Sequence, residues 1–174
     1  NVDVLSLSFG TYGCGRDVEP QMGDGDFRVP VGVRSALLGL WELSGRNLRV
    51  AASAGNDRTD EAFFPAAYAA AKCFDPSNVP PSSPPPSCDM SGSALSPWLG
   101  GVMSTPSMLG DYSNEGPWAI VRAEGSDVAS IRHDLKWYSW SGTSFAAPCA
   151  AVAAVERPGM DWFAVKGTTL DCGL

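Results

Sequence analysis

The chain has 174 residues, of which 44% are hydrophobic, enough for one domain with a sizeable core. Its 12 lysines and arginines stand against 19 aspartates and glutamates. A net charge of -7 without a basic cluster argues against binding to nucleic acid or to an acidic membrane. No apolar run approaches the roughly 20 residues of a membrane-spanning helix. We therefore expect a globular protein with neither kind of partner.

The first apolar stretch, residues 2–8 (VDVLSLS), predicts a strand of the kind buried in a parallel sheet. Neither a first Met nor the basic flank of a signal peptide precedes it, so we expect that an upstream segment was removed or is carried elsewhere. Apolar residues at helical spacing predict a helix over 31–44, which Gly45 ends. The stretch 47–56 (NLRVAASAGN) predicts the next strand. Strand, helix and strand together predict a right-handed crossover between parallel strands.

Cys73 and Cys88 bracket a segment with six prolines, which cannot form a helix or a central strand. A disulfide closing this surface loop is the simplest prediction. It would contribute about 3 kcal/mol in the loop-entropy model and would make the protein secreted or extracellular. Cys14, Cys149 and Cys172 leave an odd cysteine, either a buried thiol or a bridge to a missing segment. Because no Cys-x-x-Cys pair occurs and the chain has one histidine, we expect no zinc site.

Beyond the proline loop, residues 96–105 predict a third strand. Shorter strands are expected near 118–122, 127–131 and 135–140. An Ala-rich helix should follow from about Ser144 to Glu156, ended by Pro158 and Gly159. The class is therefore α/β, and open sheets of this class bind ligands at the carboxyl ends of their strands.

Ser144 lies in SWSGTSFAAPCAA, between a Gly-Thr pair and small apolar residues, and two interpretations are open. Thr143 or Ser144 can be the cap of the helix, accepting a hydrogen bond from a free N–H of its first turn. Alternatively, Ser144 is an accessible nucleophile at a helix N-terminus, whose N–H groups and dipole favour a developing oxyanion. Pro148 cannot donate a hydrogen bond to the carbonyl of Ser144, so we expect an irregular first turn.

Three stretches, in order, resemble the subtilisin-like serine peptidases: DVLSLSFG, the strand lining the substrate cleft; VAASAGND, the strand before the oxyanion-hole asparagine; and SGTSFAAP, the nucleophile motif. FFPAAY, YSNEG and AEGSDVAS resemble the family's connecting segments more loosely. Only the proline loop and about the last fifteen residues lack a counterpart. The resemblance implies an α/β, subtilisin-like three-layer fold with a mostly parallel central sheet, incomplete in this chain.

Residue by residue, the resemblance makes Ser144 the nucleophile that forms an acyl-enzyme and Asn56 a donor to the tetrahedral oxyanion. From the residues alone, without the other motifs, the preferred interpretation of Asn56 is a turn residue after Gly55. The resemblance also assigns the edges of the substrate cleft and its S1 pocket to two short segments, Ser8, Phe9, Gly10 and Ser53, Ala54, Gly55. Asp57 can bias that pocket toward basic side chains or be a solvated loop carboxylate.

The family's Asp and His motifs both lie upstream of everything present here. His133, the chain's single histidine, falls in SIRHDLKW, a predicted turn between two strands. Its neighbour Asp134 makes a weak dyad partner, because adjacent side chains tend to point apart. We therefore expect a solvated loop histidine. Cys149 replaces a histidine that relatives commonly carry, and we expect a small buried residue there.

Residues 1–174 are thus expected to be part of a subtilisin-like domain that lacks its upstream portion. The predicted function is a serine endopeptidase acting on peptides or proteins, with Asp and His supplied by a missing segment or a second chain. An inactive subtilase-like binding module and a noncatalytic α/β interaction domain, its serine only a cap, are the alternatives. The resemblance makes structural calcium possible and implies no other cofactor.

Overall fold

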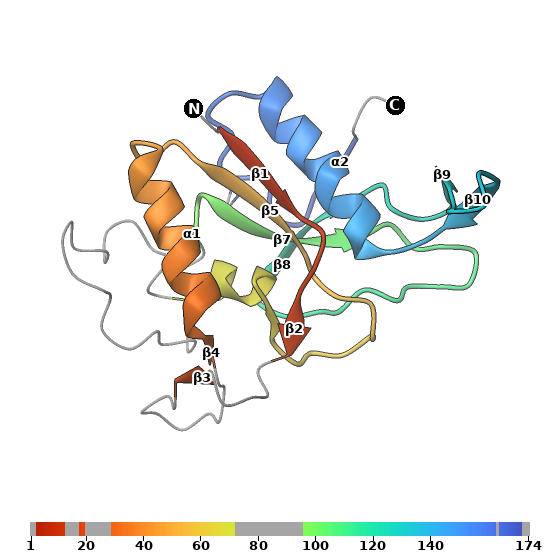
Figure 1. The fold of residues 1–174 in the computed structure, drawn as a ribbon, viewed down its shortest axis with the longest axis horizontal. Helices are drawn as coiled ribbons and strands as arrows, with labels where there is room; N and C mark the ends of the chain where they lie inside the picture. Colours follow the sequence, from red (N-terminus) through yellow and green to blue (C-terminus); the bar gives the residue numbers. More distant parts are fainter. Residues whose placement is uncertain (1–2, 13–17, 20–28, 72–95, 163, 172–174) are drawn as a thin grey trace.

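A computed structural model describes residues 3–12, 18–19, 29–71, 96–162 and 164–171. Within these ranges, five parallel strands form one sheet in the order β1-β5-β7-β8-β11 (Figure 1). The strands are β1 (Val4–Leu7), β5 (Arg49–Ser53), β7 (Leu99–Ser104), β8 (Ala119–Ala123) and β11 (Thr169–Leu170).

Two α-helices and one 3₁₀ helix accompany the sheet: α1 (Val31–Leu43), α2 (Thr143–Glu156) and η1 (Ala66–Ala70). Three antiparallel pairs of strands lie outside it: β2 (Thr11–Tyr12) with β6 (Phe63–Phe64), β3 (Val18–Glu19) with β4 (Val29–Pro30), and β9 (Val128–Ile131) with β10 (Trp137–Trp140). Within the described ranges, neither helix is long and apolar enough to cross a membrane.

The helices cover opposite faces of the sheet, which gives three layers (Figure 1). Along β5, Val50 and Ala52 pack on the side of α1 and η1, whereas Ala51 packs on the side of α2. This alternation follows from the two-residue period of a strand. Small side chains let α2 approach the sheet closely, since six of its alanines are buried: Ala146, Ala147, Ala150, Ala151, Ala153 and Ala154.

The predicted α/β class and mostly parallel sheet are confirmed, including the β1-α1-β5 crossover. The segments β2, β3, β4, β6, η1 and β11 were missed, because two to five residues are too short to show a period. The predicted disulfide between Cys73 and Cys88, like Cys14 and Cys172, lies outside the described residues.

Candidate active site

Three segments distant in sequence meet at the carboxyl edge of the sheet. Strands β1 and β5 run in parallel, with Leu7 opposite Ala52, so the residues that follow them emerge side by side. Ser53 Oγ donates a hydrogen bond of 3.5 Å to the carbonyl of Phe9. The N-terminus of α2 lies at the same edge, where Ser8 Oγ donates to the carbonyl of Ser144 at 2.8 Å. The three segments therefore lie next to one another at one edge of the sheet.

The start of α2 excludes the capping interpretation. The N-cap is Gly142, and no side chain makes a capping hydrogen bond. Gly142 N–H instead donates to the carbonyl of Gly125 at 2.9 Å, and Thr143 N–H donates to Asn56 Oδ1 at 2.8 Å. The hydroxyl of Ser144 therefore does not cap the N-terminus of the helix. Thr143 is instead held by Asn56, which lies outside the helix.

Pro148 is tolerated inside α2 because another group replaces the hydrogen bond that it cannot make. Its missing N–H would have donated to the carbonyl of Ser144, four residues earlier. That carbonyl accepts from Ser8 Oγ instead. The first turn also carries a three-residue hydrogen bond, from Phe145 N–H to Gly142 O at 3.0 Å. The predicted irregularity is thus confined to hydrogen bonding, and the helix continues to Glu156.

Asn56 is oriented by Thr143. Its Oδ1 accepts hydrogen bonds from the Thr143 N–H at 2.8 Å and from the Thr143 hydroxyl at 3.0 Å. Because Oδ1 faces Thr143, the Nδ2 of the same amide points away from Thr143. A Cβ placed on Gly142 would lie 3.1 Å from Ser144 Oγ and 3.6 Å from Asn56 Nδ2. The serine hydroxyl and the amide N–H₂ therefore face one small space beside Gly142, where a side chain would intrude.

The donors that face this space make no hydrogen bond elsewhere in the described part of the chain. Ser144 Oγ, Ser144 N–H and Asn56 Nδ2 each lack a hydrogen-bond partner among those residues. Ser144 is half-buried at the N-terminus of a 14-residue helix. Such a terminus offers free N–H groups and a positive dipole to an anion. The arrangement can thus receive negative charge developing next to the serine hydroxyl.

The predicted cleft residues divide by exposure. Ser8, Phe9 and Gly10 are exposed. By contrast, Ser53, Ala54 and Gly55 are buried, so any contact of theirs with a ligand is limited to the backbone at the strand end.

His133 lies in the exposed turn of the β9–β10 hairpin, as predicted. Its neighbour Asp134 accepts hydrogen bonds from Tyr138 OH at 3.0 Å and from the N–H of Lys136 at 3.2 Å. His133 has no interaction within the described residues. The hairpin extends to one side of the molecule in Figure 1. The structure therefore does not pair this histidine with Ser144.

Sequence reasoning missed the residues that surround Asn56. Gly55 N–H donates to Thr143 Oγ1 at 3.1 Å, and Asp57 N–H donates to Asn114 Oδ1 at 2.8 Å. Tyr12 OH donates a short hydrogen bond to Asp57 Oδ2. Burial, with the adjacent Asp57 carboxylate, raises the pKa of Tyr12. Asp57 is thus an exposed carboxylate with a hydrogen-bond partner. No local pattern signals these contacts, which join residues 45 to 88 positions apart.

Cys149 is buried, as predicted, and its sulfur is disulfide-bonded, so it offers no thiol to compete with Ser144. In the described ranges, no group of three or more His, Cys, Asp and Glu side chains gathers as a metal ion would require.

Beside Ser144, one side of α2 presents apolar residues outward: Phe145, Pro148, Val152 and Val155. Val152 is 41% exposed and Val155 is 62% exposed. We call these four residues the outer stripe of α2. They recur at helical spacing, so α2 is apolar on nearly all sides, as buried helices are.

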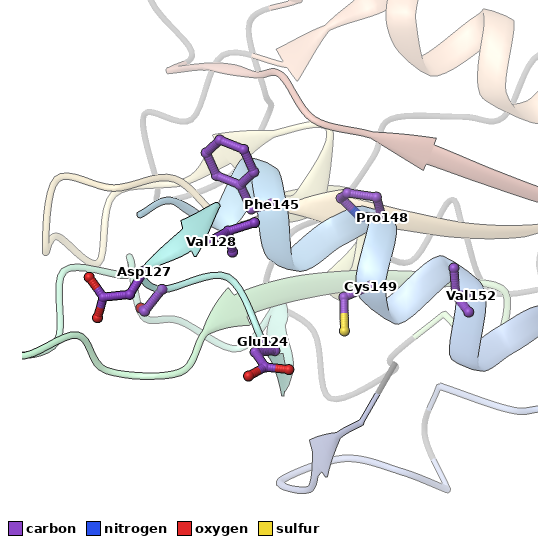
Figure 2. Close-up of a pocket in the computed structure, with 8 residues that line it drawn as sticks. Glu124, Asp127, Val128, Phe145, Pro148, Cys149 and Val152 are labelled. Carbon is purple, nitrogen blue, oxygen red and sulfur yellow. The ribbon is translucent and has the colours of Figure 1, made fainter. Parts of the chain in front are cut away.

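A cavity of about 420 Å³ adjoins the outer stripe (Figure 2). Phe145, Pro148 and Val152 line it from α2, and Glu124 and Asp127 line it from the segment between β8 and β9. The cavity is therefore apolar toward the helix, and its other side combines two carboxylates with Ser126 and Val128.

Strand β1 lies at the edge of the sheet in the described part of the chain, with one neighbour, β5. Its apolar residues Val4, Leu5 and Leu7 are only half-buried. Strands of parallel sheets are usually covered on both faces, and an unpaired edge favours association.

No protein-family model and no curated protein matches the chain. Solved structures do match. A protease from Pseudoalteromonas arctica has a TM-score of 0.54 at 18% identity, over 98% of this chain and 47% of that one. A cold-adapted subtilisin-like serine proteinase has a TM-score of 0.52 at 23% identity, over 92% and 44%. The fold is subtilisin-like. The prenylagaramide maturation protease PagA gives the same score, 0.52, at 20% identity, over 94% and 49%.

The chain spans about half the length of these proteases. At these low identities the likeness concerns the fold.

Proposed function

We propose that this chain is the nucleophile-bearing part of a subtilisin-like serine endopeptidase, with Ser144 as nucleophile and Asn56 as oxyanion donor. One observation carries the proposal: Ser144 Oγ and Asn56 Nδ2 face the same space beside Gly142, and neither has another partner in the described residues. A hydrolase that forms an acyl-enzyme through an oxyanion needs a nucleophile and an oxyanion donor at one point, and these two groups can supply them.

In the proposed reaction, Ser144 Oγ attacks the carbonyl carbon of a peptide bond and transfers its proton to a base. Asn56 Nδ2–H and Ser144 N–H donate to the oxyanion that forms. Collapse of this intermediate expels the amine, which takes up the proton, and leaves an acyl-enzyme on Ser144. Water then attacks the acyl group by the reverse proton path and frees the serine.

The proposed substrate is a peptide or protein that lies extended along two backbone segments. Its chain would run past the exposed segment Ser8–Gly10, and a side chain would enter beside the strand end at Ser53–Gly55. Asp57 lies just beyond, but its carboxylate already accepts the Tyr12 hydroxyl. We therefore propose no strict preference for basic side chains.

The base has to come from outside the described residues. A serine hydroxyl is a weak nucleophile without one, and His133 has no contact with Ser144. The solved relatives contain about as much chain again as this one. We propose that a segment equivalent to that second half, in the same polypeptide or in another, supplies Asp and His and packs on β1 and on the outer stripe of α2.

A second candidate, an inactive subtilase-like binding module, is favoured by one observation: in the described residues, no base contacts Ser144 Oγ. A secreted location, a disulfide between Cys73 and Cys88, and structural calcium remain expectations of either function.

Hydrolysis of an unfolded protein substrate by the full-length protein, with whatever polypeptide co-purifies, tests the proposal. Ser144→Ala should abolish hydrolysis, whereas Ser139→Ala, an exposed hairpin serine, should leave it unchanged. Binding of the substrate without cleavage by the unsubstituted protein would favour the binding module. Mass spectrometry of the purified material identifies a second chain if one carries the base.

A further inference from the structure

Asn114 is a fully buried polar residue in the loop between β7 and β8, and its side chain is bonded on both sides. Its Oδ1 accepts the N–H of Asp57 at 2.8 Å and the N–H of Thr59 at 3.4 Å. Its Nδ2 donates to Tyr12 OH at 2.8 Å, and its own N–H donates to Gly55 O at 3.0 Å. Asn114 thus binds the residues on both sides of Asn56.

Tyr12 connects this residue to the other wall of the proposed cleft. It is the second residue of β2, two positions after Gly10, and its ring packs edge-on against Phe63 with centroids 5.0 Å apart. Its hydroxyl accepts from Asn114 and donates to Asp57. One phenol and one amide therefore join the segment after β1 to the segment after β5.

We infer that Asn114 and Tyr12 are positioning residues that hold the Gly55–Asp57 loop so that Asn56 Nδ2 faces Ser144. Thr143 fixes the Oδ1 side of Asn56, but a side chain is only as well placed as the backbone that bears it. Asn114 fixes that backbone through Gly55 O and Asp57 N–H. The inference rests on the proposed function, because only in that function does the position of Asn56 Nδ2 affect catalysis.

The chemistry of the two residues suits this role. Asn114 has to donate on one side and accept on the other, and a side-chain amide does both without carrying a charge. An aspartate there would lose the donor and add a carboxylate next to Asp57. Gly55 is required because a Cβ on it would lie 2.2 Å from Asn114 Nδ2. The raised pKa of Tyr12 extends to higher pH the range in which its hydroxyl is protonated and able to donate.

The test variant is Tyr12→Phe, which removes the hydroxyl and keeps the ring on Phe63. Its matched control is Tyr138→Phe, which also removes a phenol bonded to an aspartate, in the hairpin. In the full-length protein, Tyr12→Phe should lower kcat by about tenfold or more, since small displacements at a site cost up to about a hundredfold. KM should change less than about twofold, and the control should change neither.

Combination with Asn56→Ala shows whether the effect passes through Asn56. In that background Tyr12→Phe should change kcat by less than about twofold, because the positioned donor is already gone. An equal loss in both backgrounds would overturn the inference. Asn114→Asp should reproduce the kcat loss of Tyr12→Phe, and a loss confined to KM would also contradict it.

A measurement without catalysis separates this inference from the proposed function. In nuclear magnetic resonance spectra of the full-length protein, Tyr12→Phe should shift and broaden the side-chain N–H₂ signal of Asn56, and Tyr138→Phe should not. An unchanged Asn56 signal overturns the positioning role even in an active enzyme. A changed signal in a protein that hydrolyses nothing would uphold the positioning and reject the peptidase.

Discussion

At the residue scale, the carbonyl of Ser144 takes its hydrogen bond from Ser8 because Pro148 has no N–H to give. We predict that Ser8→Ala lowers the free energy of unfolding by about 1 kcal/mol, the usual net value of one hydrogen bond. Ser6→Ala, which alters an exposed serine of β1 two residues before Ser8, should change it by less than about 0.5 kcal/mol. Denaturant unfolding of the three proteins measures both values.

A rescue variant identifies the cause of that loss. In a Pro148→Ala background, the new N–H can donate to the Ser144 carbonyl along the helix. Ser8→Ala should then cost clearly less than it does beside Pro148. An equal cost in both backgrounds would mean that Ser8 stabilises the protein through some other contact.

At the element scale, two glycines should respond to alanine in opposite directions. Gly55 has φ +100°, and a Cβ there would collide with Asn114, so Gly55→Ala should destabilise the protein by more than about 1 kcal/mol. Gly39 lies inside α1, and a Cβ on it would meet nothing within 4 Å. Gly39→Ala should therefore stabilise the protein by up to about 1 kcal/mol. Thermal unfolding distinguishes the two signs.

The outer stripe of α2 gives a further prediction for that helix. Val152→Asp places a charge on a surface that is 41% exposed in this chain and proposed to be covered in the assembly. Burying an unpaired charge is costly, so we expect the variant to fold but to bind the Asp- and His-bearing segment more weakly. Ser35→Asp, on the exposed side of α1, is the control. Equal retention of the second segment by both variants would argue against docking on this stripe.

The longer elements could be predicted because their periods were visible. The run at 2–8 contained β1, and 31–44 contained α1 almost to the residue. The strand predicted before Gly55 contained β5, and the helix predicted to begin at about Ser144 begins one residue earlier in the structure. The order of the strands across the sheet depends instead on long-range packing, which no window of sequence contains.

At the scale of the whole molecule, the candidate site was only half visible in the sequence. Resemblance pointed to Ser144 and Asn56, and the structure brings both to one space. The residues that orient Asn56 could not be predicted: Thr143 reaches it across 87 positions, and Asn114 reaches Tyr12 across 102. Such contacts follow from how the sheet brings its loops together, and each residue alone looked like ordinary turn or helix chemistry.

Acid stability also depends on contacts between distant segments. Burial raises the pKa of Asp111, but the hydrogen bond from Arg122, 2.6 Å away, the hydrogen bond from the N–H of Ser113 and the charge of Arg122 together outweigh it and hold that pKa below its usual value. A carboxylate whose pKa is lower in the folded than in the unfolded protein stabilises the folded state at pH values above the unfolded-state pKa of about 3.9. This stabilisation is lost as the pH falls through the folded-state pKa. Asp111→Asn should therefore destabilise the protein at pH 7 and much less near pH 2.

The control for this pH dependence is Asp60→Asn, since Asp60 makes no ion pair in the described part of the chain. Its unfolding free energy should differ little from that of the unsubstituted protein at either pH. Urea unfolding at the two pH values provides the comparison, and a pH-independent loss for Asp111→Asn would exclude the ion pair as its cause.

The most direct measurement is labelling with a fluorophosphonate, which reacts with an activated serine, followed by peptide mass mapping of the adduct. The account predicts an adduct on Ser144 in the complete assembly, and little or none on the 174-residue chain by itself, because the base lies elsewhere. Equally fast labelling of the isolated chain would contradict the account, since His133 or another of its own groups would then activate the serine. An adduct on any other serine would contradict it as well.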